Sequence, residues 1–171
     1  METLRTFIRT HNLNRKKAIC VLAGYLILVY AGSMIPQRIS ISPTDSVGAH
    51  VFLYQRNYKP SDIHKDALVV VPLYTRIRKH CWPCLVVKYI KCDAGDLLEV
   101  KNHGEFFCNN IFLGSAKKHS KEGVPVKAFE YDGIIPEGKF FAMGSCMDSY
   151  DSRYVGLENK SDIKAIAVPL F

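Results

Sequence analysis

Lys88 is the residue whose type and position most directly suggest chemistry. It lies in the middle of an apolar run, residues 85–91, with the sequence Leu-Val-Val-Lys-Tyr-Ile-Lys. Alternate residues of a strand share a face, so Lys88 is expected between Val86 and Ile90. A lysine among apolar neighbours loses hydration of its charged form, so its pKa should fall. A neutral amine near pH 7–8 is what a general base for a serine hydroxyl requires. The alternative is an edge strand from which Lys88 reaches solvent.

Two polar stretches could supply the other groups of such a site. Residues 42–48 have the sequence Ser-Pro-Thr-Asp-Ser-Val-Gly, and residues 144–156 have the sequence Gly-Ser-Cys-Met-Asp-Ser-Tyr-Asp-Ser-Arg-Tyr-Val-Gly. If the second stretch is extended, Ser149, Asp151 and Arg153 point to one side. Asp151 and Arg153 could then pair and hold the Ser149 hydroxyl beside them. This arrangement would support a polar site, although by itself it names no reaction.

Short β-branched and aromatic runs must position these residues. Gly, Asn, Asp and Pro separate the runs, and almost no period of 3.6 residues is sustained beyond the N-terminal region. The predicted strands are residues 50–54, 67–73, 85–91, 97–101, 105–113, 140–143 and 163–168. A chain of 171 residues is long enough for one domain with a core. The predicted fold class is therefore mostly β, with a single β domain.

An apolar segment near the N-terminus predicts a membrane anchor. Residues 18–35 carry no charge, and a bilayer core of about 30 Å needs roughly 20 apolar residues as a helix. Five basic residues and one acidic residue precede this segment. The positive-inside rule then places residues 1–17 in the cytoplasm, residues 18–35 in the bacterial inner membrane as a single-pass transmembrane helix, and the domain of residues 36–171 in the periplasm. A cleaved signal peptide is the alternative, although its apolar core usually has only about 7–15 residues.

Charge and cysteine content limit the partners and cofactors. Much of the formal net charge of +7 precedes the apolar segment, which argues against a nucleic-acid surface. The exported part has an odd number of cysteines, so at least one should stay free or pair outside the chain. They are Cys81, Cys84, Cys92, Cys108 and Cys146. The Cys-x-x-Cys pair, Cys81 and Cys84, is expected to be structural rather than redox-active. A zinc site from this pair with Cys92 and His80 lacks a second ligand pair of clear spacing. No metal or cofactor is predicted.

The order of these features resembles the membrane-anchored signal peptidase I family of Ser-Lys proteases. Over residues 18–168 the chain has the anchor, then Ser-x-x-Asp-Ser-x-Gly, then Val-Lys-Tyr-Ile followed by Ala-Gly-Asp, and then the stretch 144–156. That last stretch is similar to the family's Gly-Asp-Asn-x-Asp-Asn-Ser-x-Asp-Ser-Arg-Tyr box. The Tyr-Asp-Ser-Arg-Tyr sequence and the Ala-Val-Pro-Leu tail are more similar to the conjugative-transfer branch, the TraF-like pilin peptidases. The resemblance implies a signal-peptidase-like β domain.

The resemblance also implies a role for each residue of a site. Ser46 would be the nucleophile and Lys88 the general base. The stretch 144–156 would be a support strand, in which Ser149 orients the lysine and Asp151 and Arg153 hold Ser149 in place. The backbone N–H of Ser46 and the hydroxyl of Thr44 would form the oxyanion hole.

Two alternatives concern the nucleophile and its base. The residues after Ser46 lack the proline that the family has there, so Ser42 is the alternative nucleophile. His50 lies four residues after Ser46 and could form a Ser-His-Asp triad, but no acidic residue is evidently placed to orient it. Thr44 falls at the oxyanion position only if Ser46 is the nucleophile.

The implied function is that of a membrane-anchored Ser-Lys endopeptidase. It would process, and in the TraF-like branch cyclise, an exported pilin-like precursor in conjugative transfer or type IV secretion. Its partners would be the membrane, the precursor protein and the conjugation or secretion machinery, with no nucleic acid. A general signal peptidase I and a non-catalytic bitopic subunit of a secretion channel are the alternatives.

Overall fold

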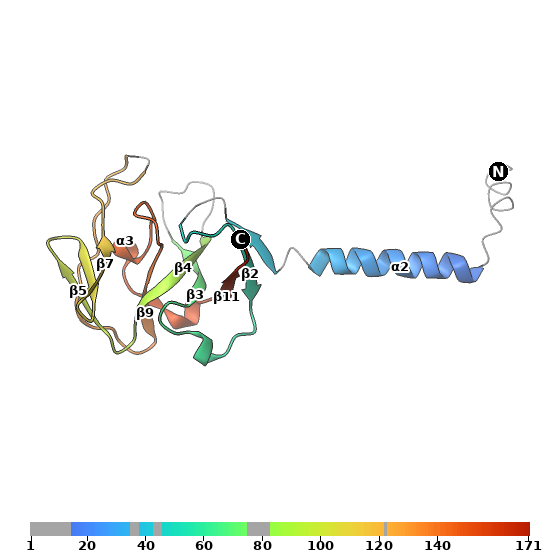
Figure 1. Ribbon diagram of the computed structural model, residues 1–171, viewed down its shortest axis with the longest axis horizontal. Coiled ribbons are helices and arrows are strands. Elements are labelled where there is room, and N and C mark those ends of the chain that lie inside the picture. Colours follow the sequence, from blue (N-terminus) through green and yellow to red (C-terminus); the bar gives the residue numbers. More distant parts are fainter. Residues whose placement is uncertain (1–14, 35–37, 43–45, 75–82, 122) are drawn as a thin grey trace. The chain divides into compact units, whose positions relative to one another are not determined.

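Figure 1 shows the computed structural model, which describes residues 15–34, 38–42, 46–74, 83–121 and 123–171. The chain divides into two compact units, residues 1–38 and residues 39–171. The first unit contains helix α2 (Arg15–Met34), which includes most of the segment predicted to span a membrane. Among the described residues, no helix is both long enough and apolar enough to cross a membrane.

The described residues of the second unit form two antiparallel β-sheets. The first sheet has the order β1-β2-β11-β3-β4-β9-β10. In that order its strands are Ile39–Ile41, Val51–Gln55, Ala165–Pro169, Leu68–Leu73, Cys84–Asp93, Lys139–Met143 and Glu158–Asn159. The second sheet has the order β7-β6-β5-β8, with strands Ile111–Ser115, Glu105–Cys108, Leu97–Lys101 and Asp132–Ile134. Three short helices complete the unit: η1 (Pro60–Asp62), α3 (Ser152–Val155) and η2 (Lys160–Asp162). The prediction of a mostly β domain is confirmed.

The predicted runs coincide with strands, with one instructive exception. Residues 105–113 were predicted as one strand, but they contain the hairpin of β6 and β7. Asn109 and Asn110 form its turn with φ of 48° and 65°, a backbone conformation that asparagine tolerates better than most residues. Strands β1, β8 and β10 have only two or three residues each, too few to produce a recognisable alternation.

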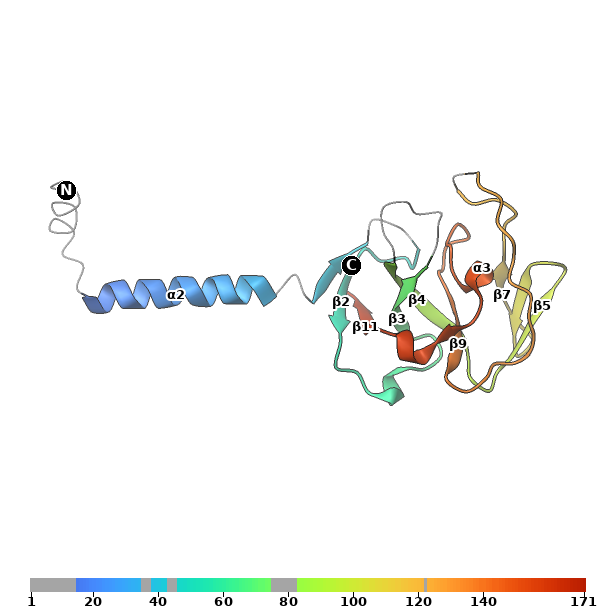
Figure 2. The same cartoon turned by 180° about the vertical axis from the view of Figure 1, so that it is seen from behind.

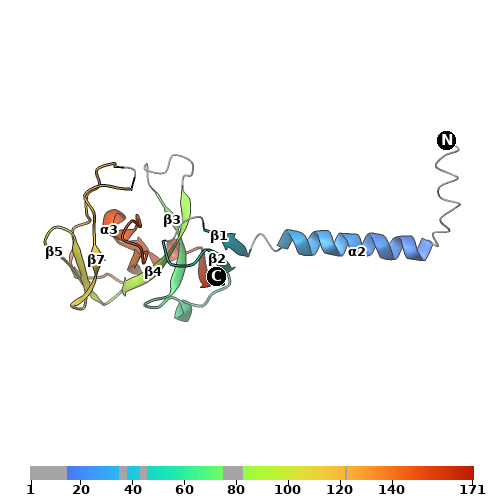
Figure 3. The same ribbon diagram turned by 45° about the horizontal axis from the view of Figure 1, so that its top comes forward.

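Strand β4 occupies a central place and brings the two sheets together. It pairs with β3 on one side and with β9 on the other, so it is no edge strand. A disulfide between Cys92 at the end of β4 and Cys108 in β6 joins the first sheet to the second. Figures 2 and 3 show α3 between the sheets. Arg153 of α3 donates to the Ser115 carbonyl at the end of β7, and Ser152 Oγ of α3 accepts the N–H of Ala142 in β9, which holds α3 there.

The face of β4 that carries Lys88 contributes to the apolar core. Val86 and Ile90 pack in one cluster with residues of the neighbouring strands and of the η2 end, namely Val69, Val71, Phe140, Ala142, Ile163 and Ile166. Lys88 shares this face by strand alternation and is only 3 % exposed. The predicted burial of the lysine is confirmed, and the edge-strand alternative is wrong.

Candidate active site

The segment after β9 is not extended, so the strand expected over residues 144–156 is a wrong prediction. Residues 144–151 form bends and turns, and α3 follows as a single helical turn. Asp151 is the N-cap of α3, and its Oδ1 accepts the backbone N–H of Arg153 at 3.2 Å. Aspartate favours this position because its carboxylate satisfies an N–H that has no partner in the first helical turn. The Asp-Ser-Arg sequence therefore starts a helix here.

Asp151 and Arg153 nevertheless form the predicted ion pair, and both are fully buried. Arg153 Nε donates to Asp151 Oδ1 and Arg153 Nη2 donates to Asp151 Oδ2, both at 2.9 Å. The remaining guanidinium hydrogen bonds go to the backbone carbonyls of Ser115, Cys146 and Ser149, at 3.0–3.1 Å. Burial opposes the charge of Arg153, but the hydrogen bond and the charge of Asp151 outweigh it and raise the pKa of Arg153 above its usual value. Arg153, held in place by Asp151, thus fixes the main chain at Ser115, Cys146 and Ser149.

Lys88 meets this segment at Ser149. Lys88 Nζ donates to Ser149 Oγ at 2.7 Å, and Ser149 is as buried as the lysine, at 4 % exposure. The carbonyl of Ser149 accepts from Arg153 and its N–H donates to the carbonyl of Cys146. The hydroxyl that contacts the amine is therefore held by the main chain around it.

The backbone carbonyl of Ser46 also lies close to Ser149. The Ser46 carbonyl accepts the N–H of Ser145 at 2.7 Å, and the next residue, Val47, is buried in the core. A Cβ built on Gly144 would lie 2.5 Å from the Ser46 carbonyl oxygen and 2.3 Å from Ser149 Oγ. These two oxygens are thus separated by no more than the sum of those distances. Ser46, Ser149 and Lys88 converge on one side of Gly144.

Sequence reasoning quoted Gly144 only as the start of a motif and assigned it no role. A signal was available, because a glycine directly after a buried strand often marks a close approach of other atoms. The Gly144 N–H also donates to Asp151 Oδ2 at 2.9 Å, so the same carboxylate holds the helix cap, the arginine and this glycine.

Other predicted residues are placed less completely. Thr44 lies outside the described residues. Ser42 N donates to the carbonyl of His50 at 2.7 Å as a continuation of the β1–β2 ladder. His50 is exposed, and its Nδ1 lies 3.2 Å from the Ser42 carbonyl oxygen. The contacts that are described place the Ser46 carbonyl oxygen close to Ser149.

Comparison with known proteins identifies the family of this chain. The family model for signal peptidase, peptidase S26, matches residues 13–171. The chain belongs to the signal peptidase S26 family. No curated protein sequence matches it. Among solved structures, a signal peptidase I from Enterococcus faecalis V583 is similar, with 18% sequence identity and a TM-score of 0.41 over 64% of this chain and 97% of that chain. The predicted family is confirmed, whereas the TraF-like branch stays a prediction. Proteins of the S26 family are serine peptidases, and signal peptidases act on precursor proteins in membranes.

This S26 domain has a further, partly buried carboxyl group that sequence reasoning missed. Glu158 in β10 accepts a hydrogen bond from Ser152 Oγ at 3.0 Å. Burial raises the pKa of Glu158 to about 7, and the charge of Asp151 acts in the same direction. The Ser152 hydrogen bond and the charge of Lys88 act against that rise. No local pattern indicates this burial, because a lone glutamate in a polar stretch usually faces solvent.

The cysteines of the S26 domain are structural where they are described. Cys92 and Cys108 form a disulfide across 16 residues, Cys84 is also disulfide-bonded, and Cys146 is a free thiol. The predicted odd cysteine is therefore Cys146. Among the described residues, the one group with metal-ligand spacing is Cys92, Asp96 and Cys108, and the disulfide removes both of its thiolates. The zinc alternative also needed Cys92, so it does not fit.

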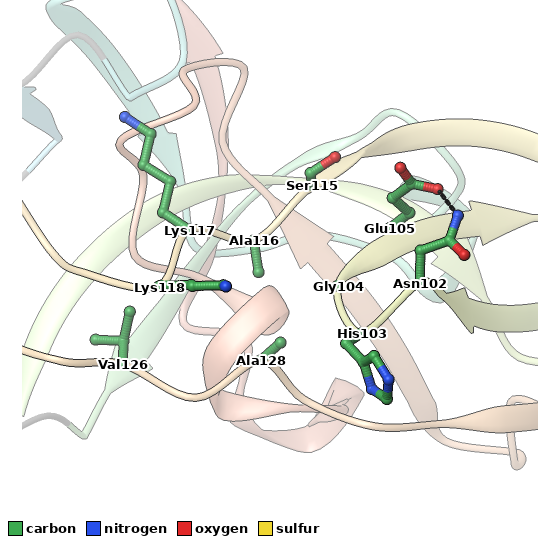
Figure 4. A pocket seen from close by; sticks show the side chains of 10 residues that line it. All are labelled: Asn102, His103, Gly104, Glu105, Ser115, Ala116, Lys117, Lys118, Val126 and Ala128. Atoms are coloured by element: carbon green, nitrogen blue, oxygen red, sulfur yellow. Dashed lines mark hydrogen bonds between the residues drawn. The ribbon is translucent and has the colours of Figure 1, made fainter.

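A polar pocket of about 250 Å³ lies apart from the Lys88–Ser149 contact. Figure 4 shows its lining, which comes from the β5–β6 turn, the end of β7 and residues 116–128. None of the predicted site residues lines it. One of its residues, Lys117, forms an ion pair with Asp148 and donates its backbone N–H to Tyr154 Oη. The pocket wall is thereby connected to the segment that carries Ser149.

Proposed function

We propose that this S26 protein is a membrane-anchored Ser-Lys endopeptidase with Ser46 as nucleophile and Lys88 as general base. The observation that carries the proposal is the 2.7 Å hydrogen bond between buried Lys88 and Ser149, beside the Ser46 backbone. An amine held by a hydroxyl in an apolar sheet has a fixed direction and little water around it. Both properties favour a neutral, correctly aimed base.

The reaction begins with a proton transfer. Lys88 Nζ accepts the Ser46 hydroxyl proton while Ser46 Oγ attacks the scissile carbonyl carbon of the precursor. The resulting oxyanion is bound by the Ser46 N–H and the Thr44 hydroxyl. The ammonium of Lys88 then returns its proton to the leaving amine, the C–N bond breaks, and an acyl ester on Ser46 remains.

The acyl-enzyme has two possible acceptors. Water, deprotonated by Lys88, gives hydrolysis and a linear product. The N-terminal amine of the precursor gives a new amide bond instead, and the product is a cyclic pilin. The second outcome belongs to the TraF-like branch, whose Tyr-Asp-Ser-Arg-Tyr sequence is present at residues 150–154.

A membrane anchor would place this chemistry beside its substrate. Supporting features are the uncharged run of residues 18–35, the basic residues before it, and the exposure of large apolar side chains along α2, such as Leu22, Ile27 and Leu28. Residues 18–34 of α2 carry no charge on any side, which suits contact with lipid, whereas α2 as a whole, which begins with Arg15, Lys16 and Lys17, is not apolar enough to cross a membrane. In this topology the N-terminus is cytoplasmic and residues 36–171 are periplasmic, where the Cys92–Cys108 disulfide can form.

The proposal is tested by co-expressing the full chain with a candidate pilin precursor and measuring the product mass. Wild-type enzyme should give a cleaved product, and a cyclic product is lighter than the linear one by one water. Ser46→Ala and Lys88→Ala should each abolish processing, while the protein still accumulates in the membrane fraction. Ser42→Ala is the matched control and should process normally.

Each other outcome points to a different conclusion. Processing that is lost in Ser42→Ala and kept in Ser46→Ala would reassign the nucleophile. Near-normal turnover by Lys88→Ala would refute the dyad. Cleavage of many unrelated exported precursors would indicate a general signal peptidase I. No processing by wild-type enzyme of any precursor would favour the non-catalytic subunit.

A further inference from the structure

Two residues at and just after the end of β7 contact the segment that carries Ser149. The Ser115 carbonyl accepts a hydrogen bond from Arg153 Nη1 at 3.0 Å. The Lys117 N–H donates to Tyr154 Oη at 2.9 Å, and Lys117 Nζ donates to Asp148 Oδ1. These contacts connect one short stretch of the second sheet to both ends of residues 148–154.

The two contacts of Lys117 reach the residues on either side of Ser149. Asp148 immediately precedes Ser149 in the chain. Tyr150 immediately follows it, and the ring of Tyr150 stacks on that of Tyr154 with centroids 5.0 Å apart and planes within 1° of parallel. Lys117 therefore contacts one neighbour of Ser149 directly and the other through a single aromatic ring.

The part of the segment before Ser149 is not held by core packing. Met147 is 64 % exposed, and Asp148 is exposed as well. After Ser149 the situation is the opposite, because Asp151 and Arg153 are fully buried and paired. The ion pair at Asp148 therefore restrains the end of the segment that the apolar core leaves to solvent.

The ion pair joins two exposed side chains. Lys117 is 41 % exposed and Asp148 is 42 % exposed. The hydrogen bond between them raises the pKa of Lys117 and lowers the pKa of Asp148, so both are charged at neutral pH. Lys121 and Arg153 also lower the pKa of Asp148, to a smaller extent. In Figure 4 the Lys117 side chain points away from the other side chains of the polar pocket.

We propose that Lys117 is a positioning residue for the reaction, because its ammonium holds Asp148 and thereby restrains Ser149 beside Lys88. This inference rests on the proposed function of Lys88 and Ser149. Ser149 Oγ accepts from Lys88 Nζ at 2.7 Å, so a displaced Ser149 misdirects the amine. Reaction rates depend steeply on such positions, whereas an exposed ion pair adds little to global stability. Loss of the Lys117 charge should therefore lower kcat with little effect on unfolding.

The kinetic test compares Lys117→Met with Lys117→Arg in the full chain. Methionine removes the charge and keeps much of the side-chain length, whereas arginine keeps the charge. Lys117→Met should lower kcat about two- to fivefold, the range that an exposed ion pair can supply, and leave KM unchanged. Lys117→Arg should retain the wild-type kcat. Lys127→Met is the matched control, because Lys127 forms a similar exposed ion pair with Glu130, and it should also retain the wild-type kcat.

Salt dependence and a double-mutant cycle are further readouts of the same contact. Raising the salt concentration from about 0.05 M to about 0.5 M should lower the wild-type kcat toward that of Lys117→Met and leave the variant nearly unchanged. Asp148→Asn should have the same effect as Lys117→Met, and the double variant should be no slower than either single variant. Equal salt dependence of wild type and Lys117→Met, or additive losses in the double variant, would overturn the inference.

A measurement without turnover separates this inference from the proposed function. Amide hydrogen exchange over residues 144–151 reports local opening of the segment. Exchange should be faster in Lys117→Met and in Asp148→Asn than in wild type, and unchanged in Lys127→Met. If exchange changes in this way but no protein cleaves a precursor, the restraint by Lys117 holds and the proposed function fails. If wild type cleaves a precursor while Lys117→Met matches it in kcat and in exchange, the inference fails and the proposed function stands.

Discussion

Replacing Gly144 with alanine is the sharpest perturbation of the proposed site. The new Cβ would lie 2.3 Å from Ser149 Oγ, 2.7 Å from Ser149 Cβ and 2.5 Å from the Ser46 carbonyl oxygen. A Cβ in a protein essentially never comes within 3.0 Å of such atoms. The Ser46 carbonyl is main chain and is fixed by the Ser145 N–H, so the Ser149 side chain must yield most. A displacement of even about 0.7 Å, the deficit from 3.0 Å, would move Ser149 Oγ off its 2.7 Å contact with Lys88.

The expected effect on activity exceeds the effect on stability. A misplacement of about 1 Å at a catalytic group can lower the rate about 100-fold. Overpacking of a buried position typically destabilises by about 1–3 kcal/mol. Gly144→Ala should therefore lower kcat at least about 100-fold while the domain remains folded. KM should change little if the substitution misdirects the Lys88 amine and leaves substrate binding unchanged.

The assay combines turnover of a precursor peptide with denaturant unfolding of the same preparation. Gly95→Ala is the control, because a Cβ there meets nothing within 4 Å although its φ of +88° is strained. It should lose stability through strain and retain kcat. A Gly144→Ala enzyme with kcat within a few-fold of wild type would refute the close convergence of Ser46 and Ser149 on this glycine.

Three further predictions concern stability. Asp151→Asn should destabilise the domain by about 3–5 kcal/mol in denaturant unfolding, because Arg153 is left as a buried charge without its partner; an unchanged midpoint would contradict the buried pair. Removing the disulfide with Cys92→Ser and Cys108→Ser should cost about 3 kcal/mol, the loop entropy of a 16-residue separation, and a reducing agent should lower the thermal midpoint of wild type by more than that of this double variant, which keeps the disulfide of Cys84. Glu158 releases its proton near pH 4.5 when unfolded and near 7 when folded, so its contribution to stability falls as pH rises between those values. Glu158→Gln should remove that fall and gain up to about 3 kcal/mol at pH 8 relative to pH 4, whereas parallel pH–stability curves for the two proteins would refute the raised pKa.

The strands could be predicted largely because alternation and turn residues are local properties. Residues 97–101 match β5 at both ends, and 140–143 lie within β9. The failures have local causes as well. Asn109 and Asn110 favour turns, so a local signal for the hairpin was present, but the apolar residues on both sides of them were read as one continuous strand. The segment 144–156 was predicted as a strand because the alternation of side chains gives no information about helix capping. Asp151 is an N-cap, and a helix begins after it.

The site could be predicted in its residue types but not in its distances. Lys88 was identified because a lysine within an apolar strand is rare. The Asp151–Arg153 pair was predicted because alternate residues share a side of an extended segment, and it forms although the segment begins a helix instead. Gly144 and Glu158 could not be identified in the same way. The role of a glycine depends on which atoms approach it, and the burial of a glutamate depends on strands that are distant in the sequence.

The wrong strand prediction also changes the interpretation of the Asp151–Arg153 pair. A buried ion pair is weak evidence for stability, because desolvation of two charges offsets most of their attraction. Here, however, Asp151 also accepts the Gly144 N–H, and Arg153 also donates to the Ser149 carbonyl. These contacts fix the positions of Gly144 and Ser149. Ser149 Oγ, which accepts from Lys88 Nζ, and the Ser46 carbonyl oxygen both lie close to Gly144. An extended segment would direct Asp151 and Arg153 to one face and leave the N–H of Gly144 to a strand partner. The helix cap lets one carboxylate hold the glycine, the arginine and the start of α3 at once. The pair thereby fixes the main chain at Gly144 and Ser149, and its role in the proposed reaction would be to hold Ser149 in place beside Lys88.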